Sequence, residues 1–288
     1  MTSTLNQDLQ FYITMLAIFS TFFGACIGSF LNVCIYRIPR DESVVKPRSH
    51  CPNCGMMIPW YLNIPVLSWL ALRGKCAKCK KPIAFRYTLV ELLTAMLFLA
   101  VYMKWVMPSA MHMQPIVHFS VVPIYWLILS GFILGTFVDF EHFIIPNSVT
   151  IGGMIAGPLI SIICPMLHNQ TIWWRGLMHS SIGLLVGFGL LFAIAELGTR
   201  AFKKEAMGFG DVKLMGAIGA FLGWKAVLFT VFASSLLGSI VGVCLILFGG
   251  VKMQSRIPFG PYICTGATIW MFWGPQIFET YMKLVMRQ

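Results

Sequence analysis

Charged residues are scarce in this chain of 288 residues. Lys, Arg, Asp and Glu together make up 11% of it, hydrophobic types make up 58%, and the mean hydropathy is +0.79. A soluble domain of this size has too small an interior to hide so much apolar surface, so the composition excludes an ordinary soluble protein. The sequence therefore predicts a polytopic membrane protein.

A glycine-rich nucleotide fingerprint is also lacking. No Gly-x-Gly-x-x-Gly motif opens a strand-helix unit, so no recognisable nucleotide fold supplies a cofactor site. Of the nine cysteines, only four occur in pairs that lie close together in the sequence. The other five stand singly in apolar segments, as small packing residues do, and are Cys26, Cys34, Cys164, Cys244 and Cys264.

Long apolar runs are abundant. A helix of about 20 apolar residues crosses the hydrocarbon core of a membrane. Eight segments fit this length, namely residues 11–36, 88–107, 119–139, 149–167, 177–198, 212–228, 229–249 and 261–282. The first is too long for the core of a cleaved signal and is expected to stay in the membrane. The predicted fold is all-α with about eight transmembrane helices. The sixth and seventh are the tightest, because residues 211–250 are few for two full crossings, and the turn near residues 223–225 is expected to lie inside the membrane.

The basic residues lie mainly on one side of this arrangement. Sixteen of the 21 Lys and Arg fall in the alternate loops 37–87, 140–148, 199–213 and 250–260. The positive-inside rule makes that side cytoplasmic and places both termini outside. The same bias explains the net charge of +11 without a nucleic-acid partner.

The loop of residues 37–87 contains two cysteine pairs. Cys51-Pro-Asn-Cys54 is followed, after 21 residues, by Cys76-Ala-Lys-Cys79. Two such knuckles supply four thiolates for a tetrahedral zinc, and a full set of four leaves no open position, so we expect one structural zinc per chain. The alternative, a pair of disulfides, requires an oxidising compartment. The loop is therefore predicted to be a small cytoplasmic zinc ribbon inserted between the first two spans.

Two of the ten acidic residues stand out by position. Asp139 ends the third apolar run and Asp211 opens the sixth, both on the side assigned to the cytoplasm. Carboxylates at membrane depth are costly and therefore indicate function. Two carboxylates on separate segments suit an aspartyl protease, in which one accepts a proton from water while the other donates to the scissile carbonyl. Glu141 cannot share this site on the same helix, because two residues of separation turn it to another face.

The sequence around these acids predicts bends. Asp211 closes Gly208-Phe209-Gly210-Asp211, whose glycines let the chain turn and another backbone approach. Pro146 follows Asp139 closely and is expected to interrupt the helix, leaving a turn suited to a substrate cleft. Glu91 enters the second span with no basic residue in its first turn, and two roles remain open for it, a contact to the ribbon or the lining of a pocket.

Together these motifs resemble the bacterial type IV prepilin peptidase family. The resemblance rests on the cysteine knuckles, on Asp139 within residues 138–147, and on Gly208–Asp211 followed by Lys213. It extends from residue 24 to residue 266, through residues 28–33, Asn63-Ile64-Pro65 and residues 257–261. It implies an aspartic endopeptidase of the bacterial inner membrane that removes the basic leader of type IV prepilins and pseudopilins after a Gly. It also implies N-methylation of the new N-terminus with S-adenosylmethionine, in type IV pilus and type II secretion systems.

The resemblance also implies roles for particular residues. Asp139 and Asp211 are the catalytic pair. The expected active-site loop residues are Gly208, Gly210, Lys213, Pro146 and Asn147, and the expected methyltransferase residues are Gly74, Lys75 and Glu91. The family often has Asp where this chain has Asn147. Three parts are expected: a first transmembrane helix (1–36), a zinc-binding domain associated with methyl transfer (37–87) and a membrane aspartyl peptidase (88–288).

Two other classes of protein remain alternatives. A transporter can use intramembrane acids as a proton relay, but it is expected to show internal repeats, and none is convincing across the eight segments. A non-enzymatic platform for pilus or secretion assembly would use the ribbon to dock a partner. In that case neither aspartate would have a role.

Overall fold

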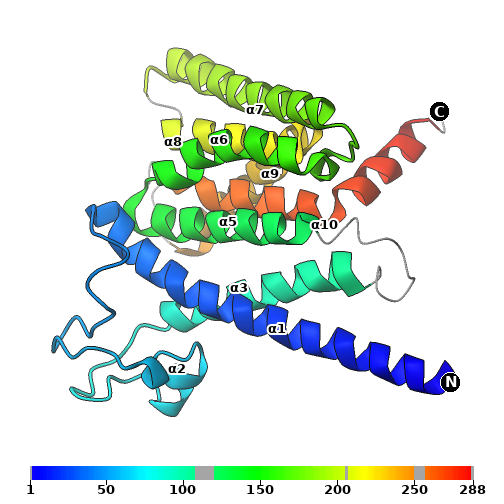
Figure 1. Cartoon of the computed structure of the whole chain (residues 1–288). Coiled ribbons are helices and arrows are strands. Elements are labelled where there is room, and N and C mark those ends of the chain that lie inside the picture. The colour runs from blue at the N-terminus through cyan, green and yellow to red at the C-terminus, as the bar shows by residue number, and fades with distance from the viewer. Residues whose placement is uncertain (1, 108–119, 205–206, 250–256, 287–288) are drawn as a thin grey trace. The chain divides into compact units, whose positions relative to one another are not determined.

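A computed structural model describes residues 2–107, 120–204, 207–249 and 257–286, which are mainly helical (Figure 1). The described residues contain no strand, only two isolated β-bridges. The long helices are α1 (Thr2–Arg37), α3 (Arg86–Val101), α5 (Val122–His142), α6 (Asn147–Ile163), α7 (Trp173–Phe202), α8 (Phe209–Leu222), α9 (Trp224–Gly249) and α10 (Gly260–Val285). A short helix, α2 (Leu67–Ala71), lies in the predicted ribbon, and a π-helical stretch (Tyr102–Val106) extends α3.

The all-α membrane fold class is confirmed. Within the described residues, five helices are long and apolar enough to cross a membrane, and their ranges are Gln10–Arg40, Arg86–Val106, Val122–His142, Trp173–Ala201 and Trp224–Phe248. The other three predicted segments lie on α6, α8 and α10. Helix α6 is apolar but has 17 residues, and α8 has 14 residues. At about 1.5 Å per residue, α8 is only about 21 Å long, shorter than the hydrocarbon core of about 30 Å.

The predicted boundary between the sixth and seventh segments, at residues 228 and 229, is wrong. Helix α8 ends at Leu222 and α9 begins at Trp224. Gly223 separates them with φ +81° and ψ 170°, a conformation that glycine adopts readily and that stops a helix. The turn expected near residues 223–225 is therefore confirmed, and only the helix ends drawn from a uniform span length, at residues 228 and 229, are wrong.

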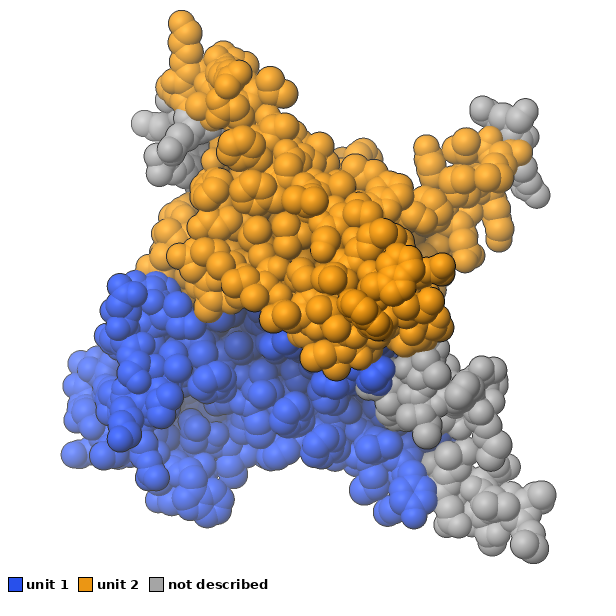
Figure 2. Space-filling view, turned by 45° about the horizontal axis from the view of Figure 1, so that its top comes forward, with its two compact units in different colours: residues 1–134 blue, residues 135–288 orange. Residues whose placement is uncertain are grey.

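The chain divides into two compact units, residues 1–134 and residues 135–288, which are coloured separately in Figure 2. In the first unit α1 packs closely along α3. A Cβ on Gly28 would lie 2.7 Å from the Cα of Glu91, so only glycine allows this approach. The Asn32 side-chain amide also donates to the Tyr87 carbonyl at 2.9 Å. These contacts fix the start of α3, with Glu91, against α1.

In the second unit α8 is the buried element. Every residue from Val212 to Phe221 except Lys213 is buried, and α6, α7 and α9 all pack on the helix. Glycines allow the closest contact, since a Cβ on Gly183 of α7 would lie 2.0 Å from the Gly219 carbonyl oxygen of α8. The Ser180 hydroxyl donates to the Ala220 carbonyl at 2.7 Å across the same interface. Protein rather than lipid therefore surrounds the helix that begins next to Asp211.

The turn between α6 and α7 contains a half-buried histidine and leads to a first prediction. His168 lies at the end of a 3₁₀ turn, with Nε2 3.0 Å from the Ser161 hydroxyl and its ring 6.4 Å from that of His179. Burial, and secondly the charge of His179, lower the pKa of His168 to about 4 from its ordinary 6.5. The unfolded chain then binds a proton between these values that the folded chain does not bind. The free energy of unfolding should therefore fall as the pH drops from 6.5 towards 4.

This effect can be isolated with His168→Gln, which cannot be protonated in this pH range. Thermal unfolding in detergent at pH 7.5 and pH 5.5 should show a smaller loss of stability for the variant than for the unaltered protein. Equal losses in the two proteins would mean that His168 does not titrate differently on unfolding.

Candidate active site and metal centre

Asp139 lies in the last turn of α5 and is 6% exposed. The backbone N–H of Gly260, the first residue of α10, donates to Asp139 Oδ2 at 3.0 Å. A Cβ on residue 260 would lie 2.7 Å from the same oxygen, so a side chain there would push the carboxylate away. The start of α10 thus fixes the orientation of one predicted catalytic acid.

Asp211 lies in the first turn of α8 and is 9% exposed. Gly208 caps this helix, and its carbonyl accepts the Asp211 backbone N–H at 3.1 Å. The charges of Asp139 and Asp211 interact with each other, and Cys264 of α10 lies close enough to interact with both. Three helices therefore bring the two predicted acids together in the interior of one unit.

The turn after α5 lies next to Asp139 and Asp211. Phe143 takes a left-handed conformation, with φ +56°, and its N–H donates to the Asp139 carbonyl at 3.0 Å. Pro146 immediately precedes α6, so the predicted interruption of the helix is confirmed. Ile145 lies against the start of α10, 3.1 Å from the Cβ position of Gly260, and against the start of α8, 3.5 Å from the Cβ position of Gly210. Its side chain therefore forms an apolar wall next to the acids.

The four predicted metal ligands also come together. The sulfurs of Cys51, Cys54, Cys76 and Cys79 all lie within 4.8 Å of one another, with Cys51 and Cys79 at 3.9 Å and Cys54 and Cys76 at 4.0 Å. A tetrahedral ion with Zn–S bonds of about 2.3 Å requires sulfurs about 3.8 Å apart. The cluster can hold such an ion with little movement.

The two knuckles share one backbone pattern. The N–H of Cys51 donates to the Met56 carbonyl at 2.9 Å, and the N–H of Cys76 donates to the Lys81 carbonyl at the same distance. An antiparallel bridge closes each loop, His50 with Met57 and Lys75 with Pro82. Backbone N–H groups of Cys79 and then Lys78 point at the Cys76 sulfur and lower the pKa of its thiol to about 6. A thiolate ready for metal binding is therefore available at neutral pH.

Comparison with known proteins identifies the family of the chain. The model of the bacterial peptidase A24 N-terminal domain matches residues 22–105, and the model of the type IV leader peptidase family matches residues 126–243. A relative from Aeromonas hydrophila, named prepilin leader peptidase/N-methyltransferase, is 34% identical over 288 residues, covering 90% of this chain and 91% of that protein. The chain belongs to the type IV leader peptidase family.

Other relatives carry the same name. One from Pseudomonas putida is 31% identical over 303 residues, covering 98% of this chain and 97% of the relative. One from Myxococcus xanthus is 40% identical over 239 residues, covering 82% of this chain and 65% of the relative. No solved structure matches the chain. The predicted family is confirmed, and membership makes this multi-pass membrane protein an enzyme of the aspartic peptidase class.

Two of the predicted active-site loop residues contact each other. Lys213 Nζ donates to Asn147 Oδ1 at 3.0 Å and lies 5.1 Å from the centre of the Phe209 ring. The contact joins the first turn of α8 to the first turn of α6. Asn147, which stands where the family often has Asp, keeps a hydrogen-bond acceptor for the lysine. Glu141 is exposed whereas Asp139 is buried, as their spacing predicts.

The predicted methyltransferase residues lie in the first unit of the chain. Glu91 accepts the Val66 backbone N–H at 2.7 Å and also the Ser29 hydroxyl, so it joins α3 to α1 and to the ribbon. Of the two roles left open for Glu91, the structure shows the contact to the ribbon. Val66 has φ +61°, which is rare for a β-branched residue, and the Glu91 contact holds this strained turn. Gly74 has φ +67° and packs on the Trp69 ring, while Lys75 is exposed.

Several residues at the active site were not predicted. Thr136 and Cys264 hydrogen-bond beside the acids, and Ile145 and Gly260 contact or flank them. Gly260 belongs to residues 257–261, a stretch that the resemblance includes. The sequence signal for Gly260 was therefore its place in that motif, which contains no titratable residue.

Proposed function

We propose that the protein removes the leader of type IV prepilins and pseudopilins after a Gly and then methylates the new N-terminal amine with S-adenosylmethionine. Asp139 and Asp211 form the catalytic pair of the first reaction. The observation that carries this proposal is the meeting of two buried acids from α5 and α8 in a chain of the leader peptidase family.

The chemistry follows from two neighbouring carboxyl groups. Like charges in close contact cannot both ionise easily, so the pair shares one proton. The ionised carboxylate takes a proton from water, and the resulting hydroxide attacks the scissile carbonyl carbon. The protonated carboxyl donates to the carbonyl oxygen. Because Asp139 Oδ2 accepts the Gly260 N–H, the shared proton lies on one of the other three carboxyl oxygens of the pair.

The loops around the acids have complementary roles in this proposal. Gly208 and Gly210 leave the backbone before Asp211 uncovered, so an extended substrate can approach it. Pro146 fixes the turn that carries Ile145, and the contact between Asn147 and Lys213 holds the start of α6 against α8, which bears Asp211. A prepilin with its basic leader in the cytoplasm and its apolar helix in the inner membrane would present the scissile bond at the depth of these helix ends.

The second reaction belongs to the N-terminal part of the chain. Residues 1–36 form the first transmembrane helix, residues 37–87 a cytoplasmic zinc-binding domain, and residues 88–288 the membrane peptidase. Cys51, Cys54, Cys76 and Cys79 hold one structural zinc, since four thiolates fill its coordination shell. S-adenosylmethionine supplies the methyl group, and Gly74, Lys75 and Glu91 are the residues assigned to that reaction. The partners are the pilin substrates and the lipid bilayer, without a nucleic acid.

The two reactions should use separable residues, and their order gives a test. Cleavage creates the amine that is methylated, so it comes first. Asp139→Asn should fail to cleave a prepilin but should methylate a substrate already trimmed to its mature N-terminus. Glu91→Gln should cleave the leader and leave the amine unmethylated. Mass spectrometry of the substrate N-terminus, with each enzyme and each substrate, measures all four results.

The unaltered enzyme with trimmed substrate is the positive control for methyl transfer. If folded Asp139→Asn protein transferred no methyl group, the acids would serve both reactions and the division proposed between the two parts of the chain would be wrong.

A further inference from the structure

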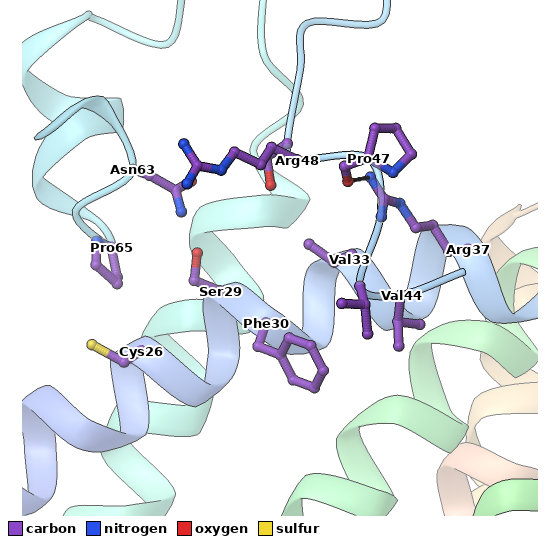
Figure 3. Close-up of a pocket in the computed structure, with 12 residues that line it drawn as sticks. Cys26, Ser29, Phe30, Val33, Arg37, Val44, Pro47, Arg48, Asn63 and Pro65 are labelled. Atoms are coloured by element: carbon purple, nitrogen blue, oxygen red, sulfur yellow. Dashed lines mark hydrogen bonds between the residues drawn. The ribbon is translucent and has the colours of Figure 1, made fainter. Parts of the chain in front are cut away.

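A groove of about 350 Å³ lies within the first unit, beside the C-terminal turns of α1 (Figure 3). One face of α1 forms its floor through Cys26, Ser29, Phe30 and Val33, whose spacing places them on adjacent turns. The segment of residues 44–49 passes over this face, and residues 63–65 close one end. Its volume lies at the lower end of the range of about 300–1,000 Å³ that small-molecule sites occupy.

Arg37 holds the covering segment in place. Its side chain is 6% exposed, and its guanidinium donates to the Ser43 carbonyl at 2.9 Å and to the Pro47 carbonyl at 2.7 Å. These bonds tie residues 43–47 to the end of α1. Arg37 therefore shapes the groove.

The groove has one polar and one apolar end. Arg48, Asn63 and Ser29 point toward the same part of it (Figure 3). Arg48 is exposed, and among the described residues its guanidinium makes no hydrogen bond or ion pair. Phe30, Val33 and Val44 line the other part (Figure 3). The groove thus fits a ligand with an anionic group at one end and a less polar body, because a guanidinium binds carboxylate and phosphate groups through paired N–H donors.

Glu91 connects the groove to methyl transfer. Both of its hydrogen bonds lead to the groove: Ser29 lies in the floor, and Val66 follows the closing residue Pro65. A residue assigned to the methyltransferase therefore positions two sides of this cavity, although it does not line the cavity itself.

We infer that this groove is the S-adenosylmethionine site, in which Arg48 binds the carboxylate of the methionine portion. The inference rests on the proposed methyltransferase function. Asn63 adds an amide beside that carboxylate, and the apolar part lies along α1. Glu91 is a positioning residue, which holds Ser29 and the 63–66 turn. A phospholipid headgroup would satisfy Arg48 equally, but it would not account for the contacts that Glu91 makes.

The test measures binding directly, in the purified full-length, zinc-loaded protein in detergent. Isothermal titration with S-adenosylmethionine and with its unreactive product, S-adenosylhomocysteine, should show binding that Arg48→Gln weakens about tenfold or more, because a charged hydrogen bond is lost. Val33→Trp, which fills the groove without changing charge, should weaken it similarly. Arg48→Lys keeps the charge without the paired donors and should fall between.

A matched control removes the same charge nearby. Arg40 lies outside the groove lining and stacks on Tyr36, so Arg40→Gln should leave binding within about twofold. Zinc content and leader cleavage should be unchanged in all four variants, which shows that each is folded.

The outcomes separate this inference from the function on which it rests. If the unaltered protein bound neither compound, the proposed methyltransferase function would itself fail. The unaltered protein could instead bind both compounds. If the affinities of both Arg48→Gln and Val33→Trp then lay within about twofold of the unaltered protein's affinity, only the groove assignment would be overturned. Native mass spectrometry that found a phospholipid lost on Arg48→Gln, with cofactor binding unaltered, would also overturn it and make the groove a lipid site.

Discussion

Changing either Asp139 or Asp211 to Asn is expected to reduce leader cleavage by at least about a hundredfold, since each acid does chemistry that the other cannot do alone. Groups that act as one unit are not additive, so the double variant should be no less active than either single variant. The substitution keeps the size of each side chain, and the Gly260 N–H still finds an acceptor at residue 139. Mass spectrometry of a purified prepilin incubated with each variant measures the loss.

Glu141→Gln is the matched control for this result. It removes a carboxylate from the same helix, two residues from Asp139, but at an exposed position. Cleavage should fall only a few-fold. An Asn variant at either catalytic position that retained more than a few per cent of the original rate would contradict the assignment of the pair.

Loss of the metal is expected to have the second large effect. The purified protein should contain about one zinc per chain, and Cys54→Ser should lower this content toward zero. A segment of about 50 residues has little core of its own, so metal binding supplies much of its folding free energy. Hydrogen exchange should then rise sharply across residues 37–87, and methyl transfer should be lost. Cleavage should persist, because both acids lie in the second unit.

Cys34→Ser provides the control, since it removes a buried thiol from α1 outside the metal cluster. Its zinc content should match that of the unaltered protein. A disulfide joining the knuckles in freshly isolated protein would refute both the zinc site and the cytoplasmic position of the ribbon.

The helical segments could be predicted because apolar runs of membrane length are local features of the sequence. The turn near residues 223–225 was predicted, but the helix ends on either side of it were not, because a uniform span length of about 20 residues assumes that every helix faces lipid from end to end. Helix α8 departs from that assumption. Its 14 residues are enclosed by other helices, and contacts such as Gly183 with Gly219 depend on which helices become neighbours.

The residues of the site fall into two groups: those that the sequence indicated, and those that only the packing of the helices brings together. Asp139, Asp211 and the cysteine pairs were visible because charge in an apolar segment and paired cysteines are each unusual by themselves. Thr136, Ile145 and Cys264 are ordinary residues of apolar helices and gain their positions only when α5, α8 and α10 converge. Arg48 is likewise one of many basic residues in its loop, and its position beside α1 follows only from the fold.

The crowding around the acids has a consequence for the substrate. Asp139 and Asp211 are buried, with Ile145 and the backbone at Gly260 packed beside them, and a peptide bond inside a helix is shielded by its own hydrogen bonds. The scissile segment must therefore unwind before it reaches the acids. A glycine makes a helix easier to open by about 1 kcal/mol relative to alanine. In the proposed reaction the Gly before the cut therefore does more than fit a small pocket: it lowers the cost of exposing the one bond that is hydrolysed.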